Sequence, residues 1–283
     1  MSAQLINHFR LSLLRVGRAI HRRGNSYSDK PFNGEPCPAC GFNVGLKMRD
    51  IIWPELALQW KLTPAWANWM NQREGLLCRN CGSNLRSRQL AKSIVDALNT
   101  RMGVHALHLD ELCSMPEMQA LSVAEINAAG HLHPFLTKLP KLSYSEYGSN
   151  NPEVPSEDLQ NLTYPDASFD LIVNSDVLEH VPDPERALAE IRRVLKPDGL
   201  HIFSVPVIWN QKRTRCRAEI RGGQLVHLLP PSHHGSRHDT KLDFLVFQEF
   251  GQDFIETCER IGWKMEKMLD ARNPSLVTFV SHR

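Results

Sequence analysis

The second half of the chain alternates short apolar runs with longer amphipathic stretches. Between two such runs, Leu188, Ile191 and Leu195 recur at the spacing of one helix face. Alternating strands and helices are typical of a parallel sheet covered on both faces, so the pattern predicts an α/β fold for residues 119–283. The runs that have the length and apolar character of strands lie at residues 120–126, 141–147, 169–174 and 200–205.

The amphipathic helix in this region has recognisable ends. Asp183 is a preferred N-cap residue, and Pro184 suits the first helical position. The sequence KPDG at 196–199 predicts a turn after the end of the helix. An earlier apolar run at residues 104–110 is an alternative first strand. That choice would leave 120–126 without a place in the sheet, so we expect 104–110 to be a helix or a connector.

Apolar residues also recur near helical spacing in the first 23 residues, with five arginines largely between them. We therefore predict a basic amphipathic helix or tail over residues 1–30. Residues 1–23 could lie on an anionic membrane surface, but a helix that packs on its own domain or frays is the simpler interpretation. The apolar positions are Leu5, Ile6, Phe9, Leu13, Val16 and Ile20.

Length and charge narrow the class of protein. A chain of 283 residues, 42% of them apolar, accommodates one domain of about 200 residues and a smaller module. No apolar run approaches the roughly 20 residues of a membrane span, and the N-terminus lacks the pattern of a secretory signal, so we expect a cytoplasmic protein. Residues 1–30 carry six Lys or Arg and one Asp, a net charge of +5. Because the whole chain has a net charge of +2, the other residues have a net charge of −3. That balance does not favour a nucleic-acid partner.

Four of the seven cysteines form two Cys-x-x-Cys-Gly motifs, Cys37 with Cys40 and Cys78 with Cys81. The two-residue gap lets both thiolates of a motif face one ion, and four thiolates complete a tetrahedral zinc site with no open position. A redox role for one motif is the alternative, but two matched motifs favour a structural zinc ion. We therefore predict a zinc-ribbon-like module over residues 31–88. The other three cysteines are isolated and fit buried apolar positions.

Four of the six tryptophans lie between the two cysteine motifs. Tryptophans can form a stacking platform for bases, but this interval has few cations and several leucines, so a packing role is the better interpretation. The sequence that follows is helical in character, and we predict a helical connector over residues 89–118. The tryptophans are Trp53, Trp60, Trp66 and Trp69.

Acidic residues end the first two predicted strands of the sheet. Glu125 ends the first and Glu146, 21 residues later, ends the second. Ligands of parallel sheets bind beyond the carboxyl ends of the strands. This spacing suits a unit in which the turn after the first strand faces a nucleotide-like cofactor and the second acid accepts hydrogen bonds from ribose hydroxyls.

The stretch at 157–206 resembles the class I S-adenosylmethionine-dependent methyltransferases, in the branch often called methyltransferase type 11. EDLQNLTYPDASFD resembles an acidic-Leu pair followed by the family's (L/F)-P-D-x-S-F-D motif, and VLEHVPDPERALAEIRRVLKPDGLHIFSVP resembles its next strand, helix, turn and strand. Less specifically, the resemblance extends over 119–283. It implies a Rossmann-like sheet of seven strands with helices on both faces.

The resemblance also implies where the cofactor would bind. VAEINAAGHLHPFL aligns with the family's glycine-rich loop, with Gly130 matching a glycine and Asn127 and Ala129 standing where glycines are usual. Asn tolerates positive φ and Ala adds a single methyl group, so we expect S-adenosylmethionine to bind. Asp158 has a second interpretation, as the start of a turn. The implied cofactor residues are Glu125 near the methionine end, Asn127 and Gly130 in the loop, Glu146 on the ribose, Asp158 and Leu159 at the adenine, and Asn174 and Ser175 at the methionine and methyl end.

Two histidines are candidate bases for an acceptor hydroxyl, whose pKa lies far above 7. His180 lies in LEHV, a family pattern that also fits a scaffolding role, and His234 lies in HLLPPSHHG, which resembles the segment HLLPPxYHG of one group of these enzymes. Five basic residues at 212–221 suggest an acidic acceptor, and a solvated loop is an equal alternative.

These features together predict an enzyme that transfers a methyl group from S-adenosylmethionine to a hydroxyl of a sugar, a glycan precursor or another small metabolite. A non-catalytic scaffold that keeps the methyltransferase fold is the first alternative, supported by the shortage of glycines. An RNA methyltransferase is the second. The acidic body of the chain argues against it.

Overall fold

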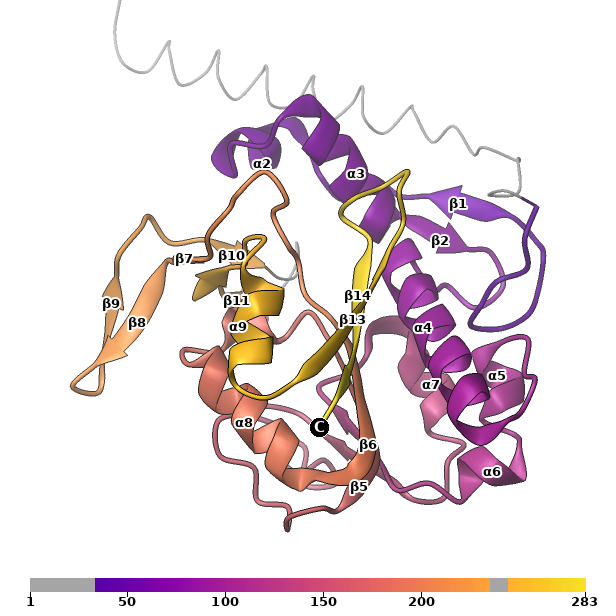
Figure 1. The fold of residues 1–283 in the computed structure, drawn as a ribbon. Helices are drawn as coiled ribbons and strands as arrows, with labels where there is room; N and C mark the ends of the chain where they lie inside the picture. Colours follow the sequence, from indigo (N-terminus) through magenta and orange to yellow (C-terminus); the bar gives the residue numbers. More distant parts are fainter. Residues whose placement is uncertain (1–33, 235–243) are drawn as a thin grey trace, which may run out of the picture.

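The computed structural model describes residues 34–234 and 244–283, so the helix predicted at residues 1–30 lies outside the described part. A six-stranded sheet at its centre has the order β4-β3-β5-β6-β14-β13 (Figure 1). The first four of these strands are parallel, and β14 runs antiparallel to both of its neighbours. Their bounds are β3 Val123–Ile126, β4 Leu142–Ser145, β5 Phe169–Ser175, β6 Leu195–Ser204, β13 Lys264–Leu269 and β14 Val277–His282.

The predicted α/β fold is confirmed, and four strands lie where the apolar runs placed them. The expected count of seven strands is wrong for the described residues, which form six in this sheet. Beyond β4 there is a single parallel bridge, between Glu146 and Ser156. Pro152 and Pro155 fall in this segment and lack the N–H groups that a ladder requires, which accounts for the missing edge strand.

One predicted turn also differs from the structure. Residues 196–199 lie inside β6, where the pairing with β5 jumps from Phe169–Leu195 to Leu171–Leu200. The sequence KPDG thus forms an irregularity in the strand. The preceding helix, α8 (Pro184–Val194), does begin as predicted, because the Asp183 side chain accepts a hydrogen bond of 3.0 Å from the N–H of Arg186.

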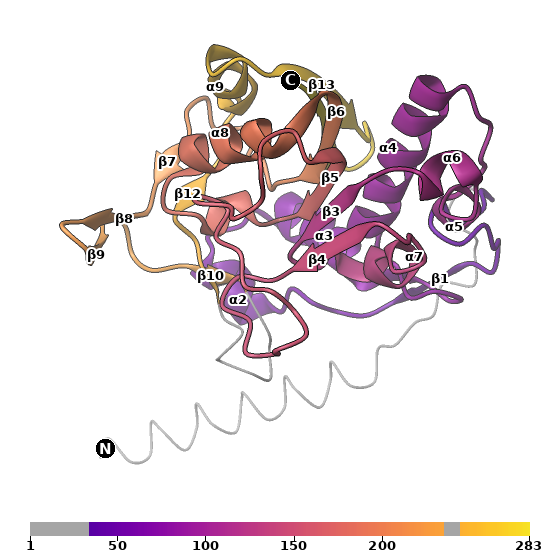
Figure 2. The ribbon, with the colours of Figure 1, turned by 90° about the horizontal axis from the view of Figure 1, so that it is seen from below.

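Helices cover both faces of the sheet, as Figure 2 shows along the strands. The alternation of β5 divides the core, since Leu171 and Val173 pack with α4 (Leu85–Met102) on one face and Ile172 packs with α8 on the other. Each fully buried aliphatic side chain contributes on the order of 2 kcal/mol to these two layers. The remaining helices are α5 Leu109–Leu112, α6 Pro116–Gln119, α7 His133–Leu136 and α9 Phe254–Arg260, with short 3-10 helices η1 Gly130–Leu132 and η2 Leu178–His180.

The cysteine module packs directly on the sheet's first helix. Its strands β1 (Leu46–Met48) and β2 (Leu76–Cys78) are antiparallel, and the helices α2 (Pro54–Gln59) and α3 (Pro64–Gly75) lie between them in the chain. Three of the four motif cysteines belong to the same buried cluster as residues of α4, β3 and β14. The segment predicted as a connector thus contains most of a helix that covers one face of the sheet.

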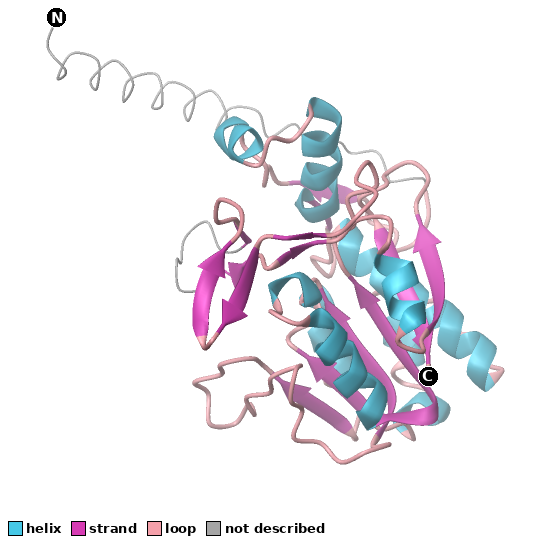
Figure 3. Cartoon of the chain, turned by 60° about the vertical axis from the view of Figure 1, so that its left-hand side comes forward, coloured by secondary structure: helices cyan, strands magenta, loops and turns pink. Residues whose placement is uncertain are grey.

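A long insertion between β6 and α9 contains only short strands. Its hairpin of β8 (Ala218–Arg221) and β9 (Gln224–His227) projects from the rest of the molecule in Figure 1, and Figure 3 turns the left-hand side of that view forward. The other short strands are β7 Arg215–Cys216, β10 His233–His234, β11 Phe244–Leu245 and β12 Gln248–Glu249. Across the described ranges, none of the helices combines the length and apolar character required to cross a membrane.

Candidate functional site

The four motif cysteines meet at one point. Their sulfur atoms all lie within 4.8 Å of one another, with 3.8 Å between the Sγ atoms of Cys37 and Cys81 and 3.9 Å between those of Cys40 and Cys78. A tetrahedron with zinc–sulfur bonds of about 2.3 Å has sulfur–sulfur edges of about 3.8 Å. The geometry of the predicted metal residues therefore fits a closed four-thiolate site.

The backbone of both motifs turns in the way that a metal knuckle requires. The N–H of Gly41 donates to the carbonyl of Cys37 at 2.8 Å, and the N–H of Gly82 donates to that of Cys78 at 2.9 Å. Both glycines have positive φ, 76° and 77°. Of the isolated cysteines, Cys113 and Cys258 are buried as predicted and Cys216 is half-buried.

The loop after β3 explains why two of its expected glycines are dispensable. Asn127 adopts a φ of 54°, the conformation for which glycine is usual, and its side-chain oxygen accepts the N–H of Tyr147 at 2.8 Å. Ala129 has an ordinary φ of −73° and needs no glycine. Gly130 does need to be glycine, because its φ is 62° and a Cβ there would lie 2.6 Å from the Ser87 hydroxyl on α4.

Glu125 stabilises this loop through hydrogen bonds of its carboxylate. Its carboxylate is fully buried, and it accepts hydrogen bonds from the N–H of Ala129 at 2.7 Å and from Nδ1 of His133 at 2.6 Å. Burial raises the pKa of Glu125. The structure thus shows Glu125 shaping the loop, while direct contact with a cofactor stays a prediction.

The ends of β4 and of the next loop carry the predicted ribose and adenine residues. Glu146 is half-buried and accepts a hydrogen bond from the Tyr144 hydroxyl. Asp158 accepts the N–H of Gln160 at 2.9 Å, and its backbone carbonyl accepts that of Asn161 at 2.8 Å. Asp158 therefore does start a turn, as its second interpretation held, and the buried Leu159 lies within that turn.

Asn174 is fully buried at the carboxyl end of β5. Among the residues that the structure describes, neither Oδ1 nor Nδ2 of its side chain has a hydrogen-bond partner. A buried amide without partners costs about 1–3 kcal/mol, so this position suits a polar group that comes from outside the described chain. A cofactor bound at this edge of the sheet would supply one.

Arg86 is a site residue that the sequence reasoning missed as a cofactor residue. It lies in the first turn of α4, and its guanidinium donates to the Ser175 hydroxyl at the end of β5. The same group lies 3.6 Å from the point where a Cβ on Gly130 would stand. Arg86 therefore lies between the loop after β3 and the end of β5. A signal was present in the sequence, because Asn84 is a good N-cap and places Arg86 at the start of a helix.

Arg73 of α3 reaches the same edge of the sheet. It is 2% exposed and pairs with Asp176, the residue that follows β5, at 2.7 Å. Burial by itself would raise the pKa of Asp176, but the positive charges of Arg73 and Arg86 lower it well below its ordinary value. Glu179, also buried, behaves oppositely, since burial and the charge of Asp176 raise its pKa well above normal. The cluster thus combines two guanidinium groups with an ionised Asp176.

The two candidate bases belong to neighbouring segments. His180 donates from Nδ1 to the carbonyl of Leu245 at 3.0 Å, which leaves the basic lone pair on Nε2, 3.7 Å from a Glu179 oxygen. Burial lowers the pKa of His180, so the ring is neutral near pH 7. His234 lies in β10, opposite Phe244 of β11, whose ring packs 5.7 Å from that of His180. The side chain of His234 lies outside the described part, and both assignments stay predictions.

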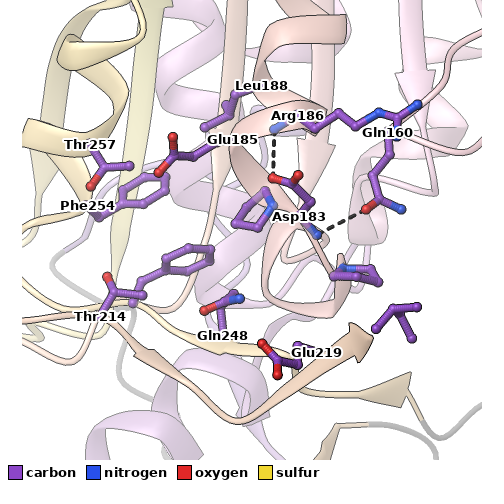
Figure 4. A pocket seen from close by; sticks show the side chains of 14 residues that line it. Gln160, Asp183, Glu185, Arg186, Leu188, Thr214, Glu219, Gln248, Phe254 and Thr257 are labelled. Carbon is purple, nitrogen blue, oxygen red and sulfur yellow. Dashed lines mark hydrogen bonds between the residues drawn. The ribbon is translucent and has the colours of Figure 1, made fainter. Parts of the chain in front are cut away.

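A cavity of about 800 Å³ lies beside this edge, between α8, α9 and the insertion (Figure 4). Gln160 connects the two regions, because its side chain accepts the N–H of Asp183 at 3.0 Å and donates to Asp158 at 3.3 Å. Phe250 and Phe254 give the cavity an apolar part. Its polar side chains include Asp183, Glu185, Glu219, Arg186, Thr214, Thr257, Gln160 and Gln248.

Comparisons with known proteins relate this chain to methyltransferases. Residues 137–203 match the family described as a methyltransferase domain. The chain is 23% identical over 209 residues to a ubiquinone biosynthesis O-methyltransferase of Photorhabdus laumondii, which covers 72% of this chain and 68% of that protein. It is 44% identical over 54 residues to a probable S-adenosylmethionine-dependent methyltransferase of Mycobacterium tuberculosis, which covers 19% of this chain and 20% of that one.

A solved S-adenosylmethionine-dependent methyltransferase from Mesorhizobium loti aligns over 60% of this chain and 94% of its own, with 17% identity and a TM-score of 0.39. The strand order of this chain by itself shows its α/β fold. The matched domain spans Glu146, Asp158 and Asn174, three of the polar residues at the carboxyl edge of the sheet. Residues 137–203 form a methyltransferase domain, and this chain is an S-adenosylmethionine-dependent methyltransferase, with S-adenosylmethionine as its methyl donor.

Proposed function

We propose that this enzyme transfers the methyl group to a hydroxyl of a small polyhydroxylated acceptor, such as a sugar or a glycan precursor. The observation that carries the proposed cofactor site is the contact of the Arg86 guanidinium with Ser175, close to Gly130, at the carboxyl ends of β3 and β5. The side-chain amide of Asn174, which precedes Ser175 in β5, is buried without a hydrogen-bond partner among the described residues. The Arg86 guanidinium has further N–H groups beside the one that donates to Ser175.

Arg86 would anchor the carboxylate of the methionine moiety. Among the described residues, its hydrogen bonds use three of its five N–H groups, one to Ser175 and two to Glu74. The two others can donate to a carboxylate, an acceptor whose geometry suits a guanidinium. Glu146, Asp158 and Leu159 would then lie along the ribose and the adenine, as the sequence predicted.

When bound, S-adenosylmethionine supplies an electrophilic methyl group on a sulfonium. The protein's own task is to hold the acceptor oxygen in line with that methyl, with the reacting atoms roughly 3 Å apart, and to take the proton of the hydroxyl. His180 can accept a proton at Nε2, and His234 is the second candidate. The neutral ring of His180 at pH 7 is the form that a base requires.

The cavity supports the acceptor class. Three carboxylates and one guanidinium line it together with two glutamines, two threonines and two phenylalanines. Such a lining suits hydroxyl groups and an apolar ring face, and it disfavours an anion. Arg215 and Arg217, which had suggested an acidic acceptor, both pair with Glu249. We therefore favour a neutral or amine-bearing acceptor. Oxygen methylation is also the activity in the name of the ubiquinone-pathway relative.

We further propose that the four cysteines hold a structural Zn²⁺ ion. A closed set of four thiolates leaves no position for water or substrate, so the ion would have no part in the chemistry. The cysteines Cys37, Cys40 and Cys78 are buried against the core of α4. The ion would therefore stabilise the helix that carries Arg86.

Isothermal titration with S-adenosylhomocysteine tests the cofactor site. Glu146→Ala should weaken binding about 10- to 100-fold, because hydrogen bonds to a charged group contribute about 1.5–3 kcal/mol. Glu153→Ala, an exposed acid of the following loop, is the matched control and should bind like the wild type. Equal affinity of Glu146→Ala and wild type would show that the ribose lies elsewhere.

A further inference from the structure

We propose that Arg73 and Glu74, which lie between the two cysteine motifs, are positioning residues for the cofactor. They fix the guanidinium of Arg86 and the end of β5, so that the cysteine module forms part of the cofactor site in addition to stabilising the fold. This inference rests on the proposed function, since it assigns Arg86 to the methionine carboxylate.

The cysteine module determines where these two residues stand. They are the last side chains of α3 before Gly75, and β2 with Cys78 follows at once. The N–H of Arg49, just after β1, donates to the carbonyl of Gly75 at 2.8 Å. The end of α3 is therefore tied to the two-stranded ribbon that carries the cysteines. Figure 1 shows this end of α3 beside β1, β2 and the start of α4.

Glu74 clamps Arg86 with both carboxylate oxygens. Its Oε1 accepts from Nε of Arg86 at 2.9 Å, and its Oε2 accepts from Nη2 at 3.2 Å. The same Oε2 accepts from the side chain of Asn84, the N-cap of α4, at 2.7 Å. Burial opposes ionisation of Glu74, but the charges of Arg86 and Arg73 lower its pKa, so the clamp is ionised at neutral pH. A bidentate pair fixes the plane of a guanidinium as well as its position.

Arg73 holds the other side of the site. It donates from Nη2 to Oδ1 of Asp176 at 2.8 Å and from Nε to the carbonyl of Ser275 at 3.0 Å. Asp176 has a φ of 53°, an uncommon conformation for a residue other than glycine, and it directly follows Ser175, which Arg86 contacts. One arginine of α3 thus links the cysteine module to the end of β5 and to the turn before β14.

The charges explain why Glu74 matters to the direction of Arg86. Nε of Arg86 is also 3.4 Å from Oδ2 of Asp176, so Asp176 is a second carboxylate within reach. Without the charge of Glu74, Arg86 would turn toward Asp176 and its remaining N–H groups would leave the space between Gly130 and Ser175. The loss would fall on a ligand's amino-acid end and spare its adenosine end.

Two ligands distinguish the contribution of the amino-acid end to binding from that of the adenosine end. S-adenosylhomocysteine has both ends, and 5′-methylthioadenosine lacks the amino acid. In calorimetric titrations, Glu74→Gln should weaken S-adenosylhomocysteine about tenfold or more while methylthioadenosine changes less than about twofold, because a charged bidentate contact is lost at one end only. Glu190→Gln is the matched control, since Glu190 clamps Arg193 of α8 with the same two-oxygen geometry. It should alter neither affinity.

A double-mutant cycle distinguishes an effect of Glu74 through Arg86 from a general loss of folding. In an Arg86→Gln background, Glu74→Gln should have little further effect on S-adenosylhomocysteine, because Glu74 acts through Arg86. Glu74→Asp, which keeps the charge, should recover part of the affinity. Additive losses, or equal losses for both ligands in Glu74→Gln, would overturn the inference. Wild-type protein that binds neither ligand would instead refute the proposed cofactor site, and the inference with it.

Discussion

His201 gives the fold a specific sensitivity to acid. It lies in β6, is fully buried, and stacks on Phe203 with 4.2 Å between ring centroids and an angle of 6°. Among the described residues, neither ring nitrogen has a hydrogen-bond partner. Burial lowers the pKa of His201 from 6.5 to about 3. The folded protein therefore holds a neutral imidazole that the unfolded chain would protonate near pH 6.5.

Because the pKa of His201 is lower in the folded protein than in the unfolded chain, acid destabilises the fold. The contribution of His201 to stability is fully present above pH 6.5 and is lost as the pH falls from 6.5 toward 3. At pH 5.0 the unfolded chain gains about 2 kcal/mol from protonating this one residue, at 1.36 kcal/mol for each pH unit. Other groups also titrate in this range, so the measurement has to compare the wild type with a variant that lacks the imidazole.

His201→Leu is that variant, because leucine fills a similar volume without a titrating group. We expect the wild type to lose about 2 kcal/mol more unfolding free energy than His201→Leu between pH 7.5 and pH 5.0. Urea unfolding followed by tryptophan fluorescence at the two pH values measures this difference. If the two proteins lose stability in parallel, His201 is protonated or hydrated in the folded state and the reasoning is wrong.

Two further predictions concern the loop and the cysteines. Gly130→Ala should destabilise the fold by about 1–3 kcal/mol, because an alanine there combines a φ of 62° with a contact of 2.6 Å to Ser87; thermal unfolding measures the loss, and Ala129→Gly, at an ordinary φ, should cost less than Gly130→Ala. Cys78→Ser should abolish stoichiometric zinc in purified protein and lower the unfolding temperature, since binding to four thiolates contributes on the order of 10 kcal/mol to folding; Cys216→Ser, outside the cluster, should keep one zinc ion per chain, and retention of zinc by Cys78→Ser would contradict the site.

The strands of the sheet could be predicted because their signal is local. Residues 169–174 and 200–205 are apolar runs bounded by polar residues, and both became strands buried on two faces. Asn127 was also predictable, since few residues other than glycine accept a positive φ. The clustering of the four cysteines could be predicted from their spacing alone. In each case the residue type and its near neighbours contain the physical reason.

The network around Arg86 could not be predicted in the same way. Arg73 and Asp176 are 103 residues apart in the chain, and Arg86 and Ser175 are 89 apart. A charged residue on a helix is expected to face solvent unless its partner is known, and the partner here depends on how the cysteine module packs on the sheet. The missing edge strand had a visible cause in Pro152 and Pro155, but family resemblance favoured a strand there.

A crystal structure with S-adenosylhomocysteine tests the central claim most directly. We expect the methionine carboxylate within hydrogen-bond distance of the Arg86 guanidinium, a polar atom of the ligand or of a bound water on the Asn174 amide, and the ribose hydroxyls on Glu146. A ligand bound instead in the cavity between α8 and α9, or an Asn174 amide that still lacks any partner in the complex, would contradict the account.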